Sequence, residues 1–218
     1  VNSDSFSVHD FDILTLYPLD FEEFLWANAE FSLTREIRNH FSDFSPMGKK
    51  LHEKALSQFR LYLIIGGMPA AIMEYKKEKK LLLDLTPSKS SLHLYPVDTG
   101  LCSCILKIPA FQLLSGEETT AGTACIETFL AQHFIRNGYA LSYWSSGNQA
   151  EVPFLLSKNS HFIAIDYRST PHQKCRNLMQ LNKSSLSPAP TQMYLISAED
   201  FRQKEAYQIV PLYAVFCI

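Results

Sequence analysis

Apolar residues follow a helical rhythm in the first part of the chain. After Pro18, apolar side chains recur three or four residues apart and predict a helix over residues 20–29, with Asp20 as its N-terminal cap or first-turn acid. The same spacing predicts helices over residues 32–41, 46–65 and 69–80, the last two separated by a break at residues 66–67. Residues 11–17 are rich in β-forming side chains, and we expect a strand or an extended approach to the first helix there.

The pattern changes in the second part, where short apolar runs alternate with turn residues. Strands are expected over residues 92–97, 140–145, 151–156, 162–168 and 193–197, and helices over residues 101–106, 123–136 and 171–181. The strongly apolar residues 209–218 form either a final strand or a packed helix. From residue 123 onward the order is helix, three strands, helix, strand. Because hairpin strands are followed by a helical crossover, we expect an α/β fold with a mixed sheet and helices on its faces.

A stretch rich in proline, serine and lysine separates these two parts. Residues 86–91 (TPSKSS) have no apolar periodicity and are typical of a linker. We therefore place a domain boundary there, between a helical region over residues 1–85 and an α/β domain over residues 92–218.

Composition and charge indicate a globular chain that lacks the overall basic charge typical of nucleic-acid-binding proteins. The 218 residues are 46% hydrophobic and 12% aromatic, and the net charge is −2 with a pI of about 6.4. Five cysteines without a disulfide rhythm, and no secretory signal at the start, favour a reducing, cytoplasmic setting. The longest apolar runs are far too short to span a bilayer.

Cationic side chains gather in two places, so contact with nucleic acid would have to be local. The two groups are Lys76, Lys77, Lys79 and Lys80, and His172, Lys174 and Arg176. The first group stands at the end of an expected helix, where compensation of the helix dipole is the structural alternative.

The candidate catalytic chemistry lies on two neighbouring strands. Glu151 opens one strand, and Asp166 and Arg168 close the next, across a polar turn at residues 158–160. Because side chains alternate along a strand, Asp166 and Arg168 share one face, and Glu151 shares a face with Pro153. Carboxylates that converge beside a cation are typical of a magnesium-dependent nuclease. Arg168 cannot lose its proton, so it can clamp a phosphate but cannot act as a base. A structural ion pair at the strand end is the alternative interpretation.

A third carboxylate, Glu127, interrupts the apolar stretch over residues 124–131. It either faces the sheet and supplements the metal site, or it is a partly exposed helix acid. Other cofactor signals are missing from the sequence. Cys102 and Cys104 are too close together for a zinc pair, and no GxxxxGK[ST] or GxGxxG occurs. We therefore expect no ATP binding by this chain and no resident cofactor, with Mg²⁺ or Mn²⁺ required only under the nuclease interpretation.

Several strings, taken in order, resemble a known family. Two of them look like segments that follow the ATPase core in a large group of bacterial and archaeal AAA-type ATPases: residues 16–25 (LYPLDFEEFL) and 59–72 (FRLYLIIGGMPAAI). Four others resemble the C-terminal domain of unknown function attached to these ATPases: residues 98–101 (DTGL), 126–130 (IETFL), 143–146 (YWSS) and 150–152 (AEV). That domain is similar to the PD-(D/E)XK restriction-endonuclease-like fold. The resemblance covers nearly the whole chain and implies an ATPase core as partner.

The sequence departs from this family in three ways. The ATPase core that precedes the first string is absent from the sequence, so the resemblance implies no ATP hydrolysis here. The connection over residues 80–94 is much shorter than the winged-helix-like connection of the family, as if internally deleted or truncated. The nuclease motif is eroded, because acid-Val-Asp is replaced by residues 151–153 (EVP) and Glu-Val-Lys by residues 166–168 (DYR). Pro153 removes both a metal-binding carboxylate and a backbone donor, which implies a poor magnesium site.

Three functional hypotheses follow from these patterns. The first, which we expect to hold, is a non-catalytic module that recognises a protein or nucleic-acid partner and assembles with an AAA-type ATPase. The second is a divergent metal-dependent nuclease, with Glu127, Glu151 and Asp166 as ligands and Arg168 as a phosphate clamp. The third is a truncated relic with little activity of its own.

Overall fold

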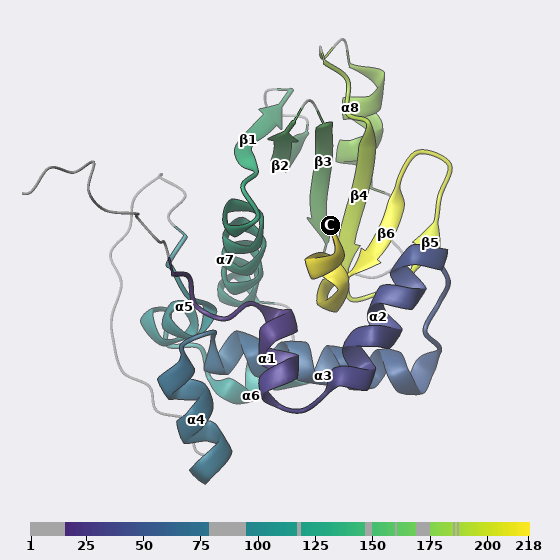
Figure 1. The fold of residues 1–218 in the computed structure, drawn as a ribbon. Helices are drawn as coiled ribbons and strands as arrows, with labels where there is room; N and C mark the ends of the chain where they lie inside the picture. The colour runs from purple at the N-terminus through teal and green to yellow at the C-terminus, as the bar shows by residue number, and fades with distance from the viewer. Residues whose placement is uncertain are drawn as a thin grey trace, which may run out of the picture.

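The computed structural model describes residues 16–78, 95–116, 119–146, 150–159, 161–168, 175–184, 186 and 188–218 (Figure 1). Its helices are α1 (Phe21–Ala27), α2 (Phe31–Asp43), α3 (Lys49–Ile65), α4 (Pro69–Glu78), α5 (Thr99–Ile105), α6 (Ala110–Ser115), α7 (Thr120–Arg136), α8 (Arg176–Lys183) and the 3-10 helix η2 (Leu212–Cys217). Its strands are β1 (Ala140–Ser145), β2 (Glu151–Lys158), β3 (His161–Arg168), β4 (Gln192–Ser197), β5 (Arg202–Gln203) and β6 (Gln208–Pro211).

The strands form one mixed sheet in the order β1-β2-β3-β4-β6-β5. Neighbouring strands from β1 to β3 are antiparallel, β3 pairs with β4 and β4 with β6 in parallel, and β5 returns antiparallel to β6. The parallel step from β3 to β4 uses α8 as its crossover. The expected α/β fold with a mixed sheet flanked by helices is confirmed.

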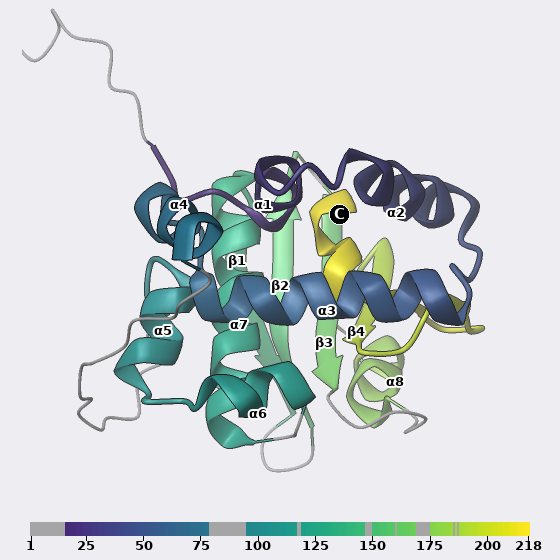
Figure 2. The same cartoon turned by 90° about the horizontal axis from the view of Figure 1, so that it is seen from below.

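Helices cover both faces of the sheet. The main hydrophobic core joins one face, which carries Phe154, Ile165 and Ile196, to the helices α1, α2, α3, α5 and α7 and to η2. A smaller core lies on the opposite face, where Leu178 and Leu181 of α8 pack against strand residues. Figure 2 shows α3 extending across the molecule, past α7 and η2.

The segments before and after residue 86 share the main core. The ring of Phe59 in α3 lies 4.8 Å from that of Phe129 in α7, and the ring of Phe21 in α1 lies 6.2 Å from that of Phe216 in η2. The predicted linker over residues 86–91 lies outside the described residues, so the domain boundary stays a prediction. Packing across it nevertheless places the N-terminal helices directly against the sheet unit.

Local signals in the sequence set several element ends. Asp20 caps α1 and forms a capping box, in which its side chain accepts from Glu23 N and Glu23 accepts from Asp20 N. Asp98 caps α5 by accepting from Leu101 N over 2.9 Å. α7 ends at Arg136, with Asn137 as its C-cap and Gly138 next at a φ of 77°. The cap expected at Asp20 is therefore confirmed.

Three parts of the chain differ from the expected elements. The strand expected over residues 92–97 is wrong for residues 95–97, which have no regular structure; Pro96 offers no backbone donor to a ladder. The helix α6 and the strand β5 were not expected. α6 has six residues and β5 has two, which are too few to show a periodicity. Residues 209–218 combine both alternatives, since β6 stops at Pro211 and η2 follows it.

Among the described helices, none is by itself both long and apolar enough to cross a membrane. Residues 49–65 and 69–76 reach the required length and composition only as a pair, with a bend of 117° between them.

Candidate functional site

Asp166 lies near the end of β3, between β2 and β4, and only 3% of its surface is exposed. Its Oδ2 atom accepts a hydrogen bond from the Cys175 thiol over 2.9 Å and lies 3.4 Å from Nη2 of Arg168. The Asn177 side chain and the backbone N–H of Tyr167 also donate to this carboxylate. Burial nevertheless outweighs these contacts and raises the pKa of Asp166 above its usual value. The carboxylate is therefore enclosed, and its oxygen atoms already interact with side chains and backbone of the protein itself.

Cys175 brings the donor to this carboxylate from the start of α8. It is fully buried, and its backbone N–H donates to the hydroxyl of Tyr207 over 3.3 Å. Burial, and then the charge of Asp166, raise the pKa of the Cys175 thiol to about 12. Since the thiolate is the reactive form of cysteine, this side chain remains a thiol and acts as a donor, not as a nucleophile.

Arg168 occupies the same face as Asp166 two residues further along β3, as the strand alternation predicts. Its side chain is 37% exposed, so one end reaches solvent while the other pairs with Asp166. Sequence reasoning gave two roles for this guanidinium, a phosphate clamp and a structural ion pair. The geometry shows the ion pair.

A β-bulge in β2 separates Glu151 from Asp166. Ser142 of β1 pairs with Leu155, but Trp144 pairs with Val152, so β2 carries one extra residue between these pairs. As a result Val152 and Leu155, three residues apart, both join the smaller core, on the side where Asp166 receives the Cys175 thiol. Glu151, which precedes Val152, therefore lies on the opposite face of the sheet. The signal in the sequence was Pro153, since a proline inside a central strand is found mainly at bulges.

Tyr95 is close enough to Glu127 and to Glu151 for both charges to act on its hydroxyl. Burial, and then the negative charges of these two carboxylates, raise the pKa of Tyr95. The ring of Tyr95 lies 6.2 Å from that of Phe154, which belongs to the main core. Glu127 and Glu151 therefore both lie on the Tyr95 side of the sheet, the face opposite to Asp166.

These positions decide which groups can reach a metal ion. Within the described residues, no three His, Cys, Asp or Glu side chains gather closely enough to bind one ion. Magnesium takes six ligands in near-octahedral geometry and usually needs at least one or two accessible carboxylates. Of the candidate ligands, Asp166 lies on one face of the sheet, and Glu151 and Glu127 lie on the other.

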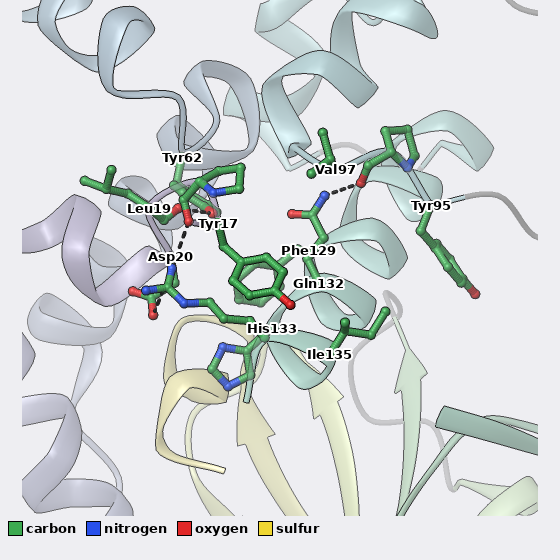
Figure 3. A pocket seen from close by; sticks show the side chains of 13 residues that line it. Tyr17, Leu19, Asp20, Tyr62, Tyr95, Val97, Phe129, Gln132, His133 and Ile135 are labelled. Carbon is green, nitrogen blue, oxygen red and sulfur yellow. Dashed lines mark hydrogen bonds and ion pairs between the residues drawn. The ribbon is translucent and has the colours of Figure 1, made fainter. Parts of the chain in front are cut away.

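A second candidate site is a cavity of about 230 Å³ between the chain entering α1 and the side of α7 (Figure 3). Its lining is mostly apolar and comes from four segments: residues 17–20, Tyr62 of α3, residues 95–97 and α7. Sequence reasoning missed this cavity because its wall combines segments that are far apart in the chain. Such a cavity is suited to an uncharged, mainly apolar group.

The polar groups around this cavity hold its walls in place. Arg136 donates to the carbonyl of Pro18 over 2.8 Å, and the Gln132 amide donates to the carbonyl of Pro96 (Figure 3). Arg136 also pairs with Glu23 over 2.8 Å. The imidazole of His133 is buried, and this burial together with the charge of Arg136 lowers its pKa to about 4. At neutral pH the cavity therefore presents an uncharged histidine.

The basic groups expected at two places are only partly described. Lys76 Nζ donates to the carbonyl of Ala27 over 2.6 Å, which caps the end of α1. Arg176 is exposed at the start of α8. The side chains of Lys77, Lys79, Lys80, His172 and Lys174 lie outside the described residues.

Comparison with known proteins gives one match. Residues 123–215, from α7 to η2, match the model of a family described as a domain of unknown function, DUF4143. Neither the curated proteins nor the solved structures contain a match to this chain.

Proposed function

We propose that this protein is a non-catalytic recognition and assembly module of an AAA-type ATPase. One observation carries the proposal: the acid at the nuclease-like position, Asp166, is enclosed and bonded to Cys175 and Arg168. A metal ion entering here would have to displace both contacts. The coordination shell of the ion would also lack the carboxylate oxygen of the family aspartate, because Pro153 stands in its place.

The order of elements supports descent from a PD-(D/E)XK nuclease-like fold. α7, the hairpin strands β1 to β3, the crossover helix α8 and the parallel strand β4 follow the order expected from the hydrophobic pattern. The match of the DUF4143 family model begins within α7 and extends through β6 into η2. A protein that lost cleavage but kept its fold would retain this order of elements and carry an altered nuclease motif, as this chain does.

The N-terminal helices support the link to an ATPase. Residues 16–25 and 59–72, the strings that resemble the segments after an ATPase core, form α1 and the junction of α3 with α4. Both pack into or against the main core, because Phe21, Phe59 and Ile72 are buried there. A unit that holds these helices firmly would couple movements of an ATPase core to the sheet.

The cavity beside α7 provides a place for recognition. Its opening is bordered by Ile135, an apolar side chain that is 48% exposed. An apolar side chain of a partner would bury this residue and fill the cavity, while Gln132 and His133 offer uncharged polar contacts within it.

Calorimetric titration with Mn²⁺, combined with cleavage assays on labelled DNA and RNA, tests the loss of catalysis. We expect no specific binding and no cleavage by the wild-type chain, and we expect Asp166→Ala to change neither result. The double variant Pro153→Asp, Arg168→Lys restores the aspartate and the lysine of the family motif and should gain Mn²⁺ affinity. Cleavage by the wild type that Asp166→Ala abolishes would replace the proposal with the divergent nuclease.

Co-elution tests the assembly role. A polypeptide that carries GxxxxGK[ST] and is encoded upstream of or next to this chain is co-expressed with it, and the two are expected to elute together in gel filtration. Ile135→Glu, at the rim of the cavity, should weaken this complex. Leu114→Glu, which alters a side chain of similar exposure (46%) on α6, should not. Separate elution of the wild-type chain and the ATPase core would overturn the assembly role.

A further inference from the structure

Two cysteine thiols meet where α5 packs against α7. Cys102 belongs to α5 and Cys125 to α7, and both side chains are buried in the main hydrophobic core. The two side chains share a hydrogen bond, in which the Cys125 thiol donates to the sulfur of Cys102. All five cysteines of the chain are free thiols. A disulfide needs its sulfur atoms about 2 Å apart, and two thiols that are already in contact reach this distance by small rotations of their side chains.

A hydroxyl on α7 also contacts the sulfur of Cys102. The Oγ1 atom of Thr128, one helical turn after Cys125, lies 3.4 Å from Cys102 Sγ and donates to the carbonyl of Ala124 over 2.8 Å. This hydroxyl can turn its proton towards the sulfur when the sulfur is charged. The hydrogen bond from Cys125, against the effect of burial, lowers the pKa of the Cys102 thiol, and the same bond and burial raise the pKa of Cys125. Cys102 is therefore the thiol that ionises first.

A pair of thiols can also bind a metal ion or take part in packing alone. Structural zinc sites use four ligands, and in the described part of the chain no third His, Cys, Asp or Glu joins this pair closely enough to hold an ion. Packing alone would not require the two thiols to contact each other, nor a hydroxyl beside one of them. Cys102 is 3% exposed and Cys125 is fully buried, so a reagent that reaches them has to be small. The arrangement therefore favours oxidation of the pair by a small molecule.

We propose that Cys102 and Cys125 form a reversible disulfide when the protein meets hydrogen peroxide. The thiolate of Cys102 attacks one oxygen of the peroxide and its O–O bond breaks. The other oxygen leaves as water with the proton that Cys102 gave up, and Cys102 becomes a sulfenic acid. The sulfur of Cys125 then attacks the sulfur of Cys102, and the S–O bond breaks to release a second water with the proton of Cys125. Two thiols are oxidised to one disulfide, and one peroxide is reduced to two waters.

The disulfide would join the DUF4143 domain to the segment that precedes it. Cys125 lies within residues 123–215, which match the family model, whereas α5 comes before them. A covalent link between α5 and α7 restricts the unfolded chain, so the oxidised form should unfold at a higher urea concentration. In the reducing setting expected from the sequence the link is transient, as in other redox-sensing proteins. This inference goes beyond the proposed function and does not depend on it.

Peptide mapping after treatment with hydrogen peroxide tests this bond. Free thiols are blocked with iodoacetamide in urea before digestion. Trypsin cuts after Lys107 and Arg136, so one peptide carries Cys102 and Cys104 and the next carries Cys125. We expect mass spectrometry to find these two peptides joined within a single chain and separated again by dithiothreitol. Cys102→Ser should abolish the joined pair, and the matched control Cys104→Ser should keep it. Separate peptides in the treated wild type, or joined peptides in Cys102→Ser, overturn the proposal.

Urea unfolding followed by circular dichroism gives a second, independent measurement. Peroxide should raise the unfolding midpoint of the wild type and of Cys104→Ser, and dithiothreitol should lower it again. The midpoint of Cys125→Ser should not rise. A wild-type midpoint that peroxide does not raise overturns the link between α5 and α7. Metal binding and co-elution with an ATPase core are measured separately, so failure here leaves those results unchanged.

Discussion

The carboxylate of Asp98 accepts a hydrogen bond from the backbone N–H of Gly67 over 2.5 Å while it caps α5. Gly67 belongs to the turn between α3 and α4, so one side chain joins two segments that lie on either side of the predicted linker. Thr99, the next residue, adds a hydrogen bond from its hydroxyl to the carbonyl of Tyr62 in α3. This junction fixes the N-terminal helices to the sheet unit.

Asp98→Ala should therefore destabilise the whole chain. It removes a helix cap and leaves the buried N–H of Gly67 without its acceptor, which together cost about 2–4 kcal/mol. Urea unfolding followed by circular dichroism measures this loss. Asp43→Ala, at an exposed carboxylate, should change the free energy of unfolding by less than about 0.5 kcal/mol. Equal effects of the two substitutions would contradict the role of the junction.

Two glycines with nearly the same backbone angle should respond differently to alanine. Gly66 has a φ of 77° and Gly48 a φ of 76°, both with an extended ψ, so a side chain strains both positions, by about 1–3 kcal/mol. A Cβ atom at Gly48 meets open space, whereas one at Gly66 would collide with the carboxylate of Asp98. Gly66→Ala should thus lose the Asp98 hydrogen bonds as well. We expect its unfolding midpoint in urea to fall well below that of Gly48→Ala, and equal midpoints would contradict this explanation.

His133 should make the protein sensitive to acid. Burial and Arg136 lower the pKa of its imidazole from 6.5 to about 4, so the unfolded chain takes up the proton first as the pH falls. Stability from this group is complete above pH 6.5 and is lost between pH 6.5 and about 4, by at most about 3 kcal/mol. His133→Gln should flatten the dependence of the free energy of unfolding on pH in this window. The control His161→Gln, at an exposed ring, should keep the wild-type slope.

Cys175 should resist alkylation in the folded protein. Its thiol is buried, donates to Asp166 and has a pKa raised to about 12, so little thiolate forms at pH 8. Mass spectrometry after treatment with iodoacetamide should find Cys175 unmodified in native protein and modified in urea. Asp166→Asn removes the carboxylate charge that helps to raise this pKa and should speed the native reaction. Rapid modification of Cys175 in the folded wild type would contradict the enclosed geometry.

The parts of the fold that depend on residues close together in the sequence were predictable. The acid at position 20 placed the start of α1, because caps act within one helical turn. The alternation of side chains in β3 correctly put Asp166 and Arg168 on one face, and they form an ion pair. Within this single strand, spacing alone was sufficient.

The candidate site was not predictable to the same extent, because it depends on how strands pair. The interpretation from spacing placed Asp166, Glu151 and Glu127 around one ion. The bulge at Pro153 places Glu151 on the face opposite to Asp166, where its charge acts on Tyr95 instead. The extra residue in β2 is defined only against its partner β1, and no pattern within β2 alone gives this register.

The sequence by itself determined the α/β class, the order of most helices and strands and the proline in the nuclease-like motif, because these follow from periodicity and local chemistry. The tertiary structure alone decided that Asp166 is enclosed by Cys175 from α8 and that β1 forms an edge of the sheet in the described part of the chain. Burial and edge position arise from contacts between residues far apart in the chain. Desolvation of a carboxylate and the position of a strand within its sheet therefore appear only when all the layers are assembled.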